Sequence, residues 1–93
     1  MPFSHGFRPY TKADVESLNP NQNGVYGLYR GSAPIYVGRG DIRTRLLAHL
    51  NGDNSCITRS SPSQWTAEVR NDDVAREKAL ILELDPPCNK KVG

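Results

Sequence analysis

The chain has 93 residues, a formal net charge of +2, 37% hydrophobic residues and 24% charged residues. A chain of this length can bury one small core, so we expect a single domain over residues 1–93; its pI of about 8.7 allows a polyanionic partner without requiring one. No apolar run approaches the about 20 residues of a membrane span, and the N-terminus lacks the order of a secretory signal, so we expect a cytoplasmic protein that is not secreted and has no membrane partner.

Residues 1–23 are expected to form an N-terminal arm and one short helix. Residues 1–10 show no hydrophobic periodicity, which favours an arm. Thr11 is a suitable N-cap for a helix in "KADVESL", where Asp14 would lie near the positive end of the helix dipole. An Asn-Pro pair then ends this helix.

Two β-rich segments predict a hairpin. "GVYGLYR" covers residues 24–30 and "IYVG" covers residues 35–38, with the four residues "GSAP" between them as the turn. Because side chains alternate along a strand, Tyr26 and Tyr36 can point from the same face. The glycines leave the sheet uncovered nearby, so a nucleic-acid backbone could come close, and a bulky residue at Gly38 should block that approach.

Other large side chains of the sheet are expected to pack. Val25, Ile35 and Val37 have the opposite parity to the two tyrosines and should face the core. Tyr29 and Trp65 are expected to be packing residues as well.

A second helix is expected after the hairpin. Asp41 is a suitable N-cap, and Ile42, Leu46 and Leu50 follow at helical spacing. An Asn-Gly pair at residues 51–52 should close this helix.

Arg45 and His49 lie four positions apart beside this apolar stripe, so their side chains should project together. Arginine offers a permanent fork of donors to phosphoryl oxygens, and histidine can relay a proton near neutral pH, which favours a phosphate site. Arg39 and Arg43 add positive charge nearby. The alternative is a solvated basic face with a histidine near the negative end of the helix dipole.

The rest of the chain predicts one more strand and the longest helix. Residues 51–64 read as a polar loop long enough to suspect a function, residues 65–70 as a strand, and residues 71–84 as a helix that a Pro-Pro pair stops. The predicted fold class is α+β, with a small three-stranded antiparallel sheet flanked by helices in the order (α)ββαβα. Cys56 and Cys88 have neither zinc spacing nor the density of a disulfide scaffold, so two free thiols are expected.

Glu77 interrupts the apolar stripe of the last helix. The stripe consists of Val74, Ile81 and Leu84. A carboxylate among apolar side chains loses hydration, which a cation, a metal or hydrogen-bond donors must offset. A structural pair with an arginine is the alternative to a functional role. Glu68 and Glu83 show no such conflict and are expected to be solvated.

Together these features resemble the GIY-YIG nuclease superfamily over about residues 24–89. "GVY" and "YVG" match its two naming tripeptides, with Val in place of Ile, and are a weak signal alone. "GRGDIRTRLLAH" is similar to the family's helix with an arginine and a histidine, and "EKALILELDPPCN" to its closing segment with a metal-binding glutamate, a proline and an asparagine. The matching positions are Arg45, His49, Glu77, Pro86 and Asn89. The order and spacing of these residues make the combined signal specific.

The resemblance implies a divalent-metal-dependent endonuclease that hydrolyses phosphodiester bonds of DNA. The ion would be Mg²⁺ or Mn²⁺, one per active site, because only one carboxylate converges on the site. DNA would be the partner, and the protein would be nucleoid-associated while bound to it. A monomer would suffice for nicking, and a homodimer for double-strand breaks. Repair, recombination, restriction and phage or mobile-element DNA processing all use this unit.

By the same resemblance, each site residue has an expected role. Glu77 would hold the metal, and Arg45 would hold the scissile phosphate. Tyr26 would be the general base, and Tyr36 would hydrogen-bond the phosphate or the attacking water. His49 would position Tyr26 or take its proton.

Asn89 would tie the end of the domain to the site. The residues expected to contact nucleic acid are Gly38, Arg39, Arg43 and Arg59. The chain departs from the family at Cys88, where an aromatic residue is common, and in the loop at residues 51–64, which shows no family pattern.

Two other functions stay open. One is a non-catalytic nucleic-acid-binding module on the same fold, which predicts loss of Glu77 or Arg45, although both are present. The other is an interaction protein with a structural Glu77–Arg45 pair, which leaves both tyrosines and the asparagine unexplained.

Overall fold

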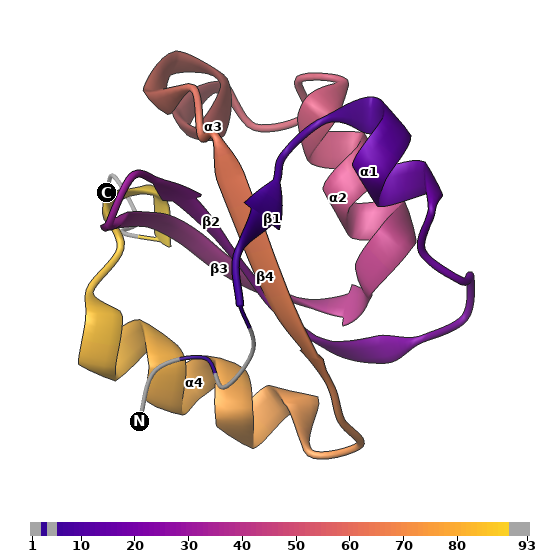
Figure 1. The fold of residues 1–93 in the computed structure, drawn as a ribbon. Helices are drawn as coiled ribbons and strands as arrows, with labels where there is room; N and C mark the ends of the chain where they lie inside the picture. The colour runs from indigo at the N-terminus through magenta and orange to yellow at the C-terminus, as the bar shows by residue number, and fades with distance from the viewer. Residues whose placement is uncertain (1–2, 4–5, 90–93) are drawn as a thin grey trace.

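The structure is a computed structural model that describes residue 3 and residues 6–89. An antiparallel sheet has α4 on one face and α1, α2 and α3 on the other (Figure 1). The strands are β1 (Arg8–Pro9), β2 (Asn23–Arg30), β3 (Ala33–Asp41) and β4 (Gln64–Val69). The helices are α1 (Lys12–Glu16), α2 (Ile42–Leu50), α3 (Ser55–Ser60), α4 (Asp73–Leu84) and the 3₁₀ turn η1 (Pro87–Asn89).

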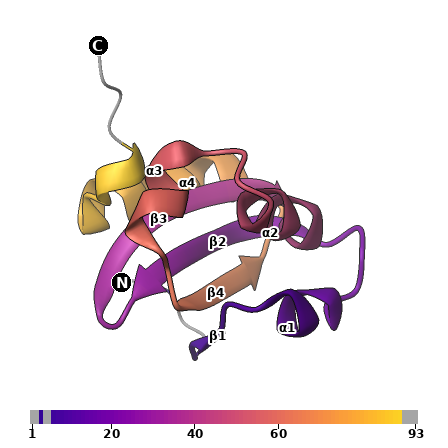
Figure 2. The ribbon, with the colours of Figure 1, turned by 90° about the horizontal axis from the view of Figure 1, so that it is seen from above.

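The strand order β1-β4-β2-β3 leaves β3 at an edge of the sheet (Figure 2). The α+β class is as predicted, but the expectation of three strands is wrong. Arg8 and Pro9, placed in the arm, pair with Gln64 and Trp65 of β4 and so form a fourth strand. A two-residue strand that contains a proline has no alternation to detect, because its pairing partner alone defines it. Residues 1–2 and 4–5 of the expected arm lie outside the described residues.

The hairpin of β2 and β3 aligns Tyr26 with Gly38 and Leu28 with Tyr36. Arg30 pairs with Ala33, so the turn has two central residues rather than the four expected. Gly31 supplies the positive φ of 61° that such a turn uses.

Each face of the sheet has its own hydrophobic cluster. Tyr26 and Leu28 pack with α1, α2 and α3, and Tyr36 lies against the same cluster. Val25 and Val37 pack on the other face with Leu80 of α4. The predicted division of tyrosines and valines between two faces is therefore confirmed.

The two predicted helix caps are confirmed. The Thr11 side chain accepts a hydrogen bond from the backbone N–H of Asp14 at 3.2 Å, and the Asp41 side chain accepts one from Thr44 at 3.0 Å. Tyr29 and Trp65 are buried packing residues, as expected. The apolar stripes of α2 and α4 are shorter than predicted, because Leu50 of α2 is 36% exposed and Val74 of α4 is 61% exposed.

The segment read as a polar loop contains α3, which begins at an Asn54 cap. Cys56 on this helix forms a disulfide with Cys88 of η1, and their Cα atoms are 5.5 Å apart. The expectation of two free thiols is therefore wrong. Two cysteines 32 positions apart meet only because the fold brings α3 beside η1, which spacing along the chain does not reveal.

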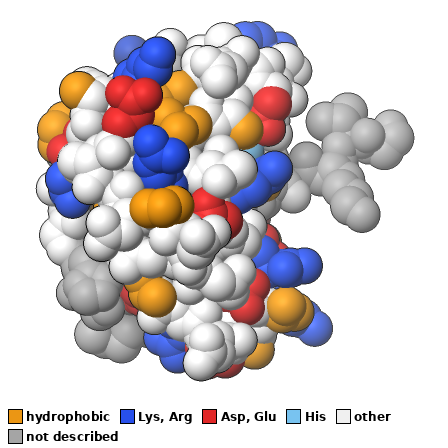
Figure 3. All heavy atoms as spheres, turned by 90° about the vertical axis from the view of Figure 1, so that its right-hand side faces the viewer, with side chains coloured by type: hydrophobic (Ala, Val, Ile, Leu, Met, Phe, Trp, Pro, Cys, Tyr) orange, Lys and Arg blue, Asp and Glu red, His pale blue; other side chains and the backbone are white. Residues whose placement is uncertain are grey.

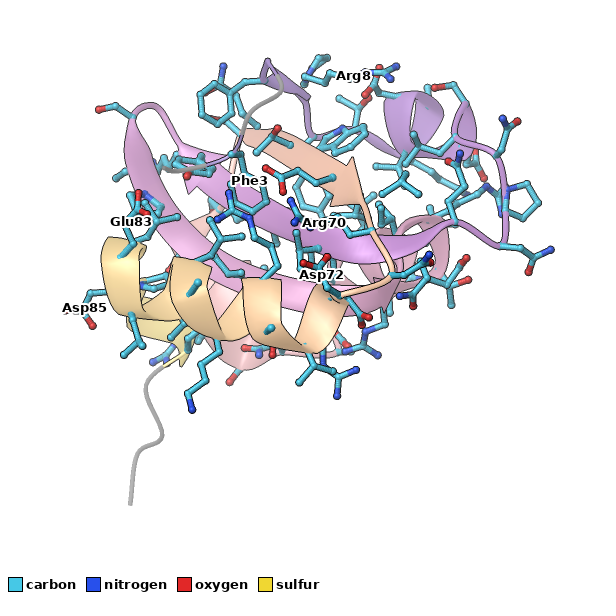
Figure 4. The ribbon with its side chains drawn as sticks, turned by 90° about the horizontal axis from the view of Figure 1, so that it is seen from below. Phe3, Arg8, Arg70, Asp72, Glu83 and Asp85 are labelled. Carbon is cyan, nitrogen blue, oxygen red and sulfur yellow. A yellow bond between two sulfur atoms is a disulfide. The ribbon has the colours of Figure 1, made fainter. Side chains whose placement is uncertain are left out.

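Glu68 is also placed differently from the prediction. It is buried, and its carboxylate accepts hydrogen bonds from Arg70 at 3.1 Å and Arg76 at 3.1 Å. Figure 4 shows Arg70 beside Asp72 near the start of α4, with Phe3 between α4 and the sheet. Two arginines compensate a carboxylate that the alternation of β4 turns toward α4. Glu83 is exposed, as expected.

In the part of the chain that the structure describes, no helix combines the length and apolar character needed to cross a membrane.

Candidate active site at the edge of the sheet

Three aromatic rings meet where α2 crosses the hairpin. The ring centroids of Tyr26 and Tyr36 are 6.3 Å apart, and the His49 ring lies 5.6 Å from the first and 5.2 Å from the second. Tyr26 and His49 are buried, whereas Tyr36 is partly exposed. The strand register and the helical position of His49 thus bring two phenols and an imidazole together, and the solvated basic face is wrong for His49.

A chain of hydrogen bonds runs from Tyr26 through His49 to Asp53. The Tyr26 hydroxyl lies 2.7 Å from His49 Nε2, and His49 Nδ1 lies 2.7 Å from Asp53 Oδ1. A carboxylate only accepts, so the neutral imidazole carries its proton on Nδ1 and donates it to Asp53. Nε2 is then the acceptor for the Tyr26 hydroxyl.

Asp53 was missed by the sequence interpretation, which assigned a site role only to Arg59 within residues 51–64. The signal available was its spacing from His49: the two are four positions apart. This spacing was not interpreted as a helical pair because Asp53 follows the end of α2, and the Asn-Gly pair predicts a turn there.

Arg45 completes this group from the preceding turn of α2. Its interaction with the Tyr26 hydroxyl raises the pKa of Arg45, so the guanidinium stays charged beside this tyrosine. Tyr26 thus donates to His49 with a guanidinium charge nearby.

Burial dominates the acid–base behaviour of the group. It raises the pKa of Tyr26 well above its usual value, and the nearby Tyr36 raises it further, while Arg45 opposes both effects. Burial lowers the pKa of His49, against the opposite influence of Asp53. At neutral pH the phenol is therefore protonated and the imidazole is neutral, which is the arrangement for passing a proton from Tyr26 to His49.

Gly38 faces Tyr26 across the hairpin. A Cβ atom at this position would collide with the Tyr26 hydroxyl and ring. The packing of Tyr26 therefore explains why residue 38 is a glycine. From the sequence, this glycine had been explained by the approach of a nucleic-acid backbone.

Glu77 lies on α4 across the edge strand from the tyrosines. Its carboxylate is 3.7 Å from Arg39 of β3, so the expected arginine partner exists but is not Arg45. Burial raises the pKa of Glu77, Arg39 lowers it, and the neighbouring Asp73 raises it. Burial raises the pKa of Tyr36, Arg45 lowers it, and Glu77 raises it further, so this carboxylate acts electrostatically on the tyrosine group.

Asn89 is bonded to the exposed edge of β3. Its side chain accepts a hydrogen bond from the Val37 backbone N–H at 2.7 Å and donates one to the Val37 carbonyl at 2.8 Å. One amide thus pairs with both backbone groups of a residue between Tyr36 and Gly38, as a neighbouring strand would do.

The basic residues expected to contact nucleic acid come from three elements: Arg39 from β3, Arg43 from α2 and Arg59 from α3. Arg39 is engaged by carboxylates, whereas the side chains of Arg43 and Arg59 make no hydrogen bond or ion pair among the described residues. Figure 3 shows basic and acidic side chains interspersed over the face seen from the right of Figure 1.

One curated protein is similar to this chain in sequence. The UvrABC system protein C of Aquifex aeolicus is 33% identical over 73 residues, which cover 71% of this chain and 12% of that protein. The chain thus corresponds to a small part of that relative's length. No protein-family model matches the chain.

Solved structures share the fold. The magnesium-bound GIY-YIG N-terminal endonuclease domain of UvrC from Thermotoga maritima has a TM-score of 0.73 and 24% identity, over 85% of this chain and 96% of that one. An asparagine-to-alanine variant of that domain, bound to its catalytic divalent cation, has a TM-score of 0.73 and 22% identity, over 86% and 96%. The fold implied by the resemblance to the GIY-YIG superfamily is confirmed, because the chain has the fold of the GIY-YIG endonuclease domain of UvrC.

Proposed function

We propose that this protein is a divalent-metal-dependent endonuclease that hydrolyses phosphodiester bonds of DNA. The observation that carries the proposal is the hydrogen-bonded chain of Tyr26, His49 and Asp53 beside Arg45, because it combines a proton path with a fixed positive charge. Similarity to a domain described as an endonuclease bound to magnesium supports the reaction class.

Glu77 fits the expected cation. It is a partly buried carboxylate whose desolvation raises its pKa, so it gains from a cation placed against it. Among the described residues no three His, Cys, Asp or Glu side chains form a group able to hold a metal ion. This favours one Mg²⁺ or Mn²⁺ ion that keeps most of its waters, since magnesium commonly binds through one or two carboxylates. When bound, such an ion supplies positive charge for the phosphoryl oxygens and acidifies a water.

The residues of the chain would move the proton in two linked transfers. Tyr26 would take a proton from the attacking water while its own hydroxyl proton passes to His49 Nε2. Asp53 would hold the imidazole in the accepting tautomer and stabilise the imidazolium that forms. This linked transfer avoids a free phenolate, which burial makes costly in the absence of substrate.

Arg45 and Tyr36 would act on the phosphate. The Arg45 guanidinium would donate to the phosphoryl oxygens as negative charge grows, and the partly exposed Tyr36 hydroxyl would hydrogen-bond the phosphate or the water. Asn89 would keep β3 in register beneath them. Gly38, Arg43 and Arg59 would line the path of the DNA backbone.

We further infer a single domain over residues 1–93, with a core at residues 24–89. It would be a cytoplasmic protein, nucleoid-associated on DNA, that nicks as a monomer or cuts both strands as a homodimer. Repair, recombination, restriction and mobile-element processing are the roles that fit such a unit, and the similarity to UvrC directs attention to repair.

Cleavage of supercoiled plasmid DNA tests the proposal. Wild-type protein should convert it to nicked or linear forms with Mg²⁺ and not with EDTA, and Glu77→Gln should be inactive while still binding DNA. Glu83→Gln, a matched change on the exposed face of the same helix, should cut like wild type. Wild-type protein that binds DNA but leaves it intact with both Mg²⁺ and Mn²⁺ would instead be the non-catalytic module.

A further inference from the structure

The side chain of Arg39 lies between two carboxylates of α4. Its Nη1 atom is 3.5 Å from Asp73 Oδ2, and its Nε atom is 3.7 Å from Glu77 Oε1. The guanidinium side chain is 46% exposed, whereas the side chains of Asp73 and Glu77 are only 12% and 25% exposed. One positive charge that can move into solvent therefore compensates only part of two negative charges that are largely shielded from it.

The contacts of Arg39 are loose. Elsewhere in the protein, Arg70 meets Asp72 in a two-point arrangement, with contacts of 2.7 Å and 2.9 Å. Arg39 makes only one longer contact with each of its two partners. Exposed single-point ion pairs contribute little, so a stronger cation can displace this guanidinium.

Asp73 and Glu77 form a pair on one face of α4. They are four positions apart, so one helical turn separates them, and the charge of Asp73 raises the pKa of Glu77. Asp73 lies in the first turn of α4, where the helix dipole favours the ionised carboxylate. With Arg39 present the group still carries one excess negative charge, which a divalent ion would neutralise better than a guanidinium.

We propose that Arg39 is a resident counter-ion at the metal position, that it competes with the divalent ion for this position, and that Asp73 is the second carboxylate of the site. This inference rests on the proposed function, in which Glu77 holds the metal. Metal binding releases Arg39 from α4, and the freed guanidinium is then available to a DNA phosphate. The site thus exchanges an internal cation for an external one.

Calorimetric titration of Mn²⁺ and Mg²⁺ into the DNA-free protein tests this exchange at low ionic strength. Arg39→Gln should bind the ion about tenfold more tightly than wild type, the effect of removing a unit charge about 6 Å from a divalent ion in a water-like dielectric. Arg43→Gln removes the same charge from α2, where it makes no ion pair among the described residues, and should leave the affinity within about twofold of wild type. Asp73→Asn should weaken binding about tenfold, and Glu77→Gln should abolish it.

Each result has one meaning. Equal metal affinities for Arg39→Gln and Arg43→Gln would overturn the proposed role of Arg39 as a counter-ion. Wild-type metal affinity in Asp73→Asn would overturn the proposed role of Asp73 as the second carboxylate of the site. A wild-type protein that takes up no divalent ion would overturn the proposed cofactor itself, which separates the two failures. If Asp73→Asn loses its helical circular dichroism, Asp73→Ser carries the same comparison. A larger rise in melting temperature on adding Mg²⁺ to Arg39→Gln than to wild type would support the exchange independently.

Discussion

Breaking the disulfide between Cys56 and Cys88 should destabilise the protein and disturb its candidate active site together. The bond joins α3 to η1, and Asn89 follows Cys88 directly. Asn89 in turn holds the backbone of Val37 by two hydrogen bonds, next to Tyr36. Reduction removes the covalent restraint on η1, so we expect Asn89 to leave the edge of β3 more often.

The loss of stability can be calculated from the length of the closed loop. The cysteines are 32 positions apart, and the loop-entropy relation then gives roughly 3–4 kcal/mol at 25 °C. Small domains have roughly 0.05–0.15 kcal/mol of stability per residue, which is about 5–14 kcal/mol for a chain of this length. Reduction should therefore remove a large fraction of the free energy of unfolding.

Urea unfolding followed by tryptophan fluorescence measures this change with and without dithiothreitol. The Cys56→Ser/Cys88→Ser variant should resemble the reduced protein and should not respond to the reductant. In single-turnover cleavage, reduction should slow the wild-type protein, whereas Asn89→Ala should already be slow and respond little. Two thiols per chain in the unreduced, denatured protein, or an unfolding free energy unchanged by reduction, would refute the reasoning.

Four substitutions test the tyrosine group. Gly38→Ala should cost about 1–3 kcal/mol of stability and most of the cleavage rate, because its Cβ displaces the Tyr26 ring; urea unfolding and plasmid cleavage check both, and an unchanged rate would contradict the packing. Tyr26→Phe should lower the single-turnover rate about 10²–10⁴-fold while DNA affinity stays constant, and wild-type rates would move the general base elsewhere. The cleavage rate should be lost only at pH values below about 6.5, because the pKa of His49 is lowered and protonation of its accepting nitrogen stops the transfer. His49→Gln should be slow and should show no such loss of rate at acidic pH. Because the pKa of His49 is lowered by folding, neutral His49 contributes stability above about pH 6.5, and this stability is lost as pH falls through the folded-state pKa. The free energy of unfolding of His49→Gln, measured in urea, should therefore depend less on pH. Arg45→Lys should lose about 10²–10³ in rate, because a point charge does not replace the fork; near-normal cleavage by this variant would make Arg45 an ordinary surface charge.

Local signals in the sequence determined the elements that stand around the site. The alternation in β2 and β3 placed Tyr26 and Tyr36 on one face before any partner was known, because a strand has a period of two. Asp41 marked the start of α2, and the helical repeat then placed Arg45 and His49 side by side. Each of these inferences needs only residues that are near one another along the chain.

Contacts between distant segments had to come from the tertiary structure. The pairing of Cys56 with Cys88, the burial of Glu68 beneath α4 and the short strand β1 each depend on which elements become neighbours. The partner of Glu77 is a further case: helical periodicity showed that its carboxylate needs a cation, but only the position of β3 beside α4 selects Arg39 rather than Arg45. Periodicity along one segment predicts which face a side chain occupies; the charge it meets there is set by the segment that packs against that face.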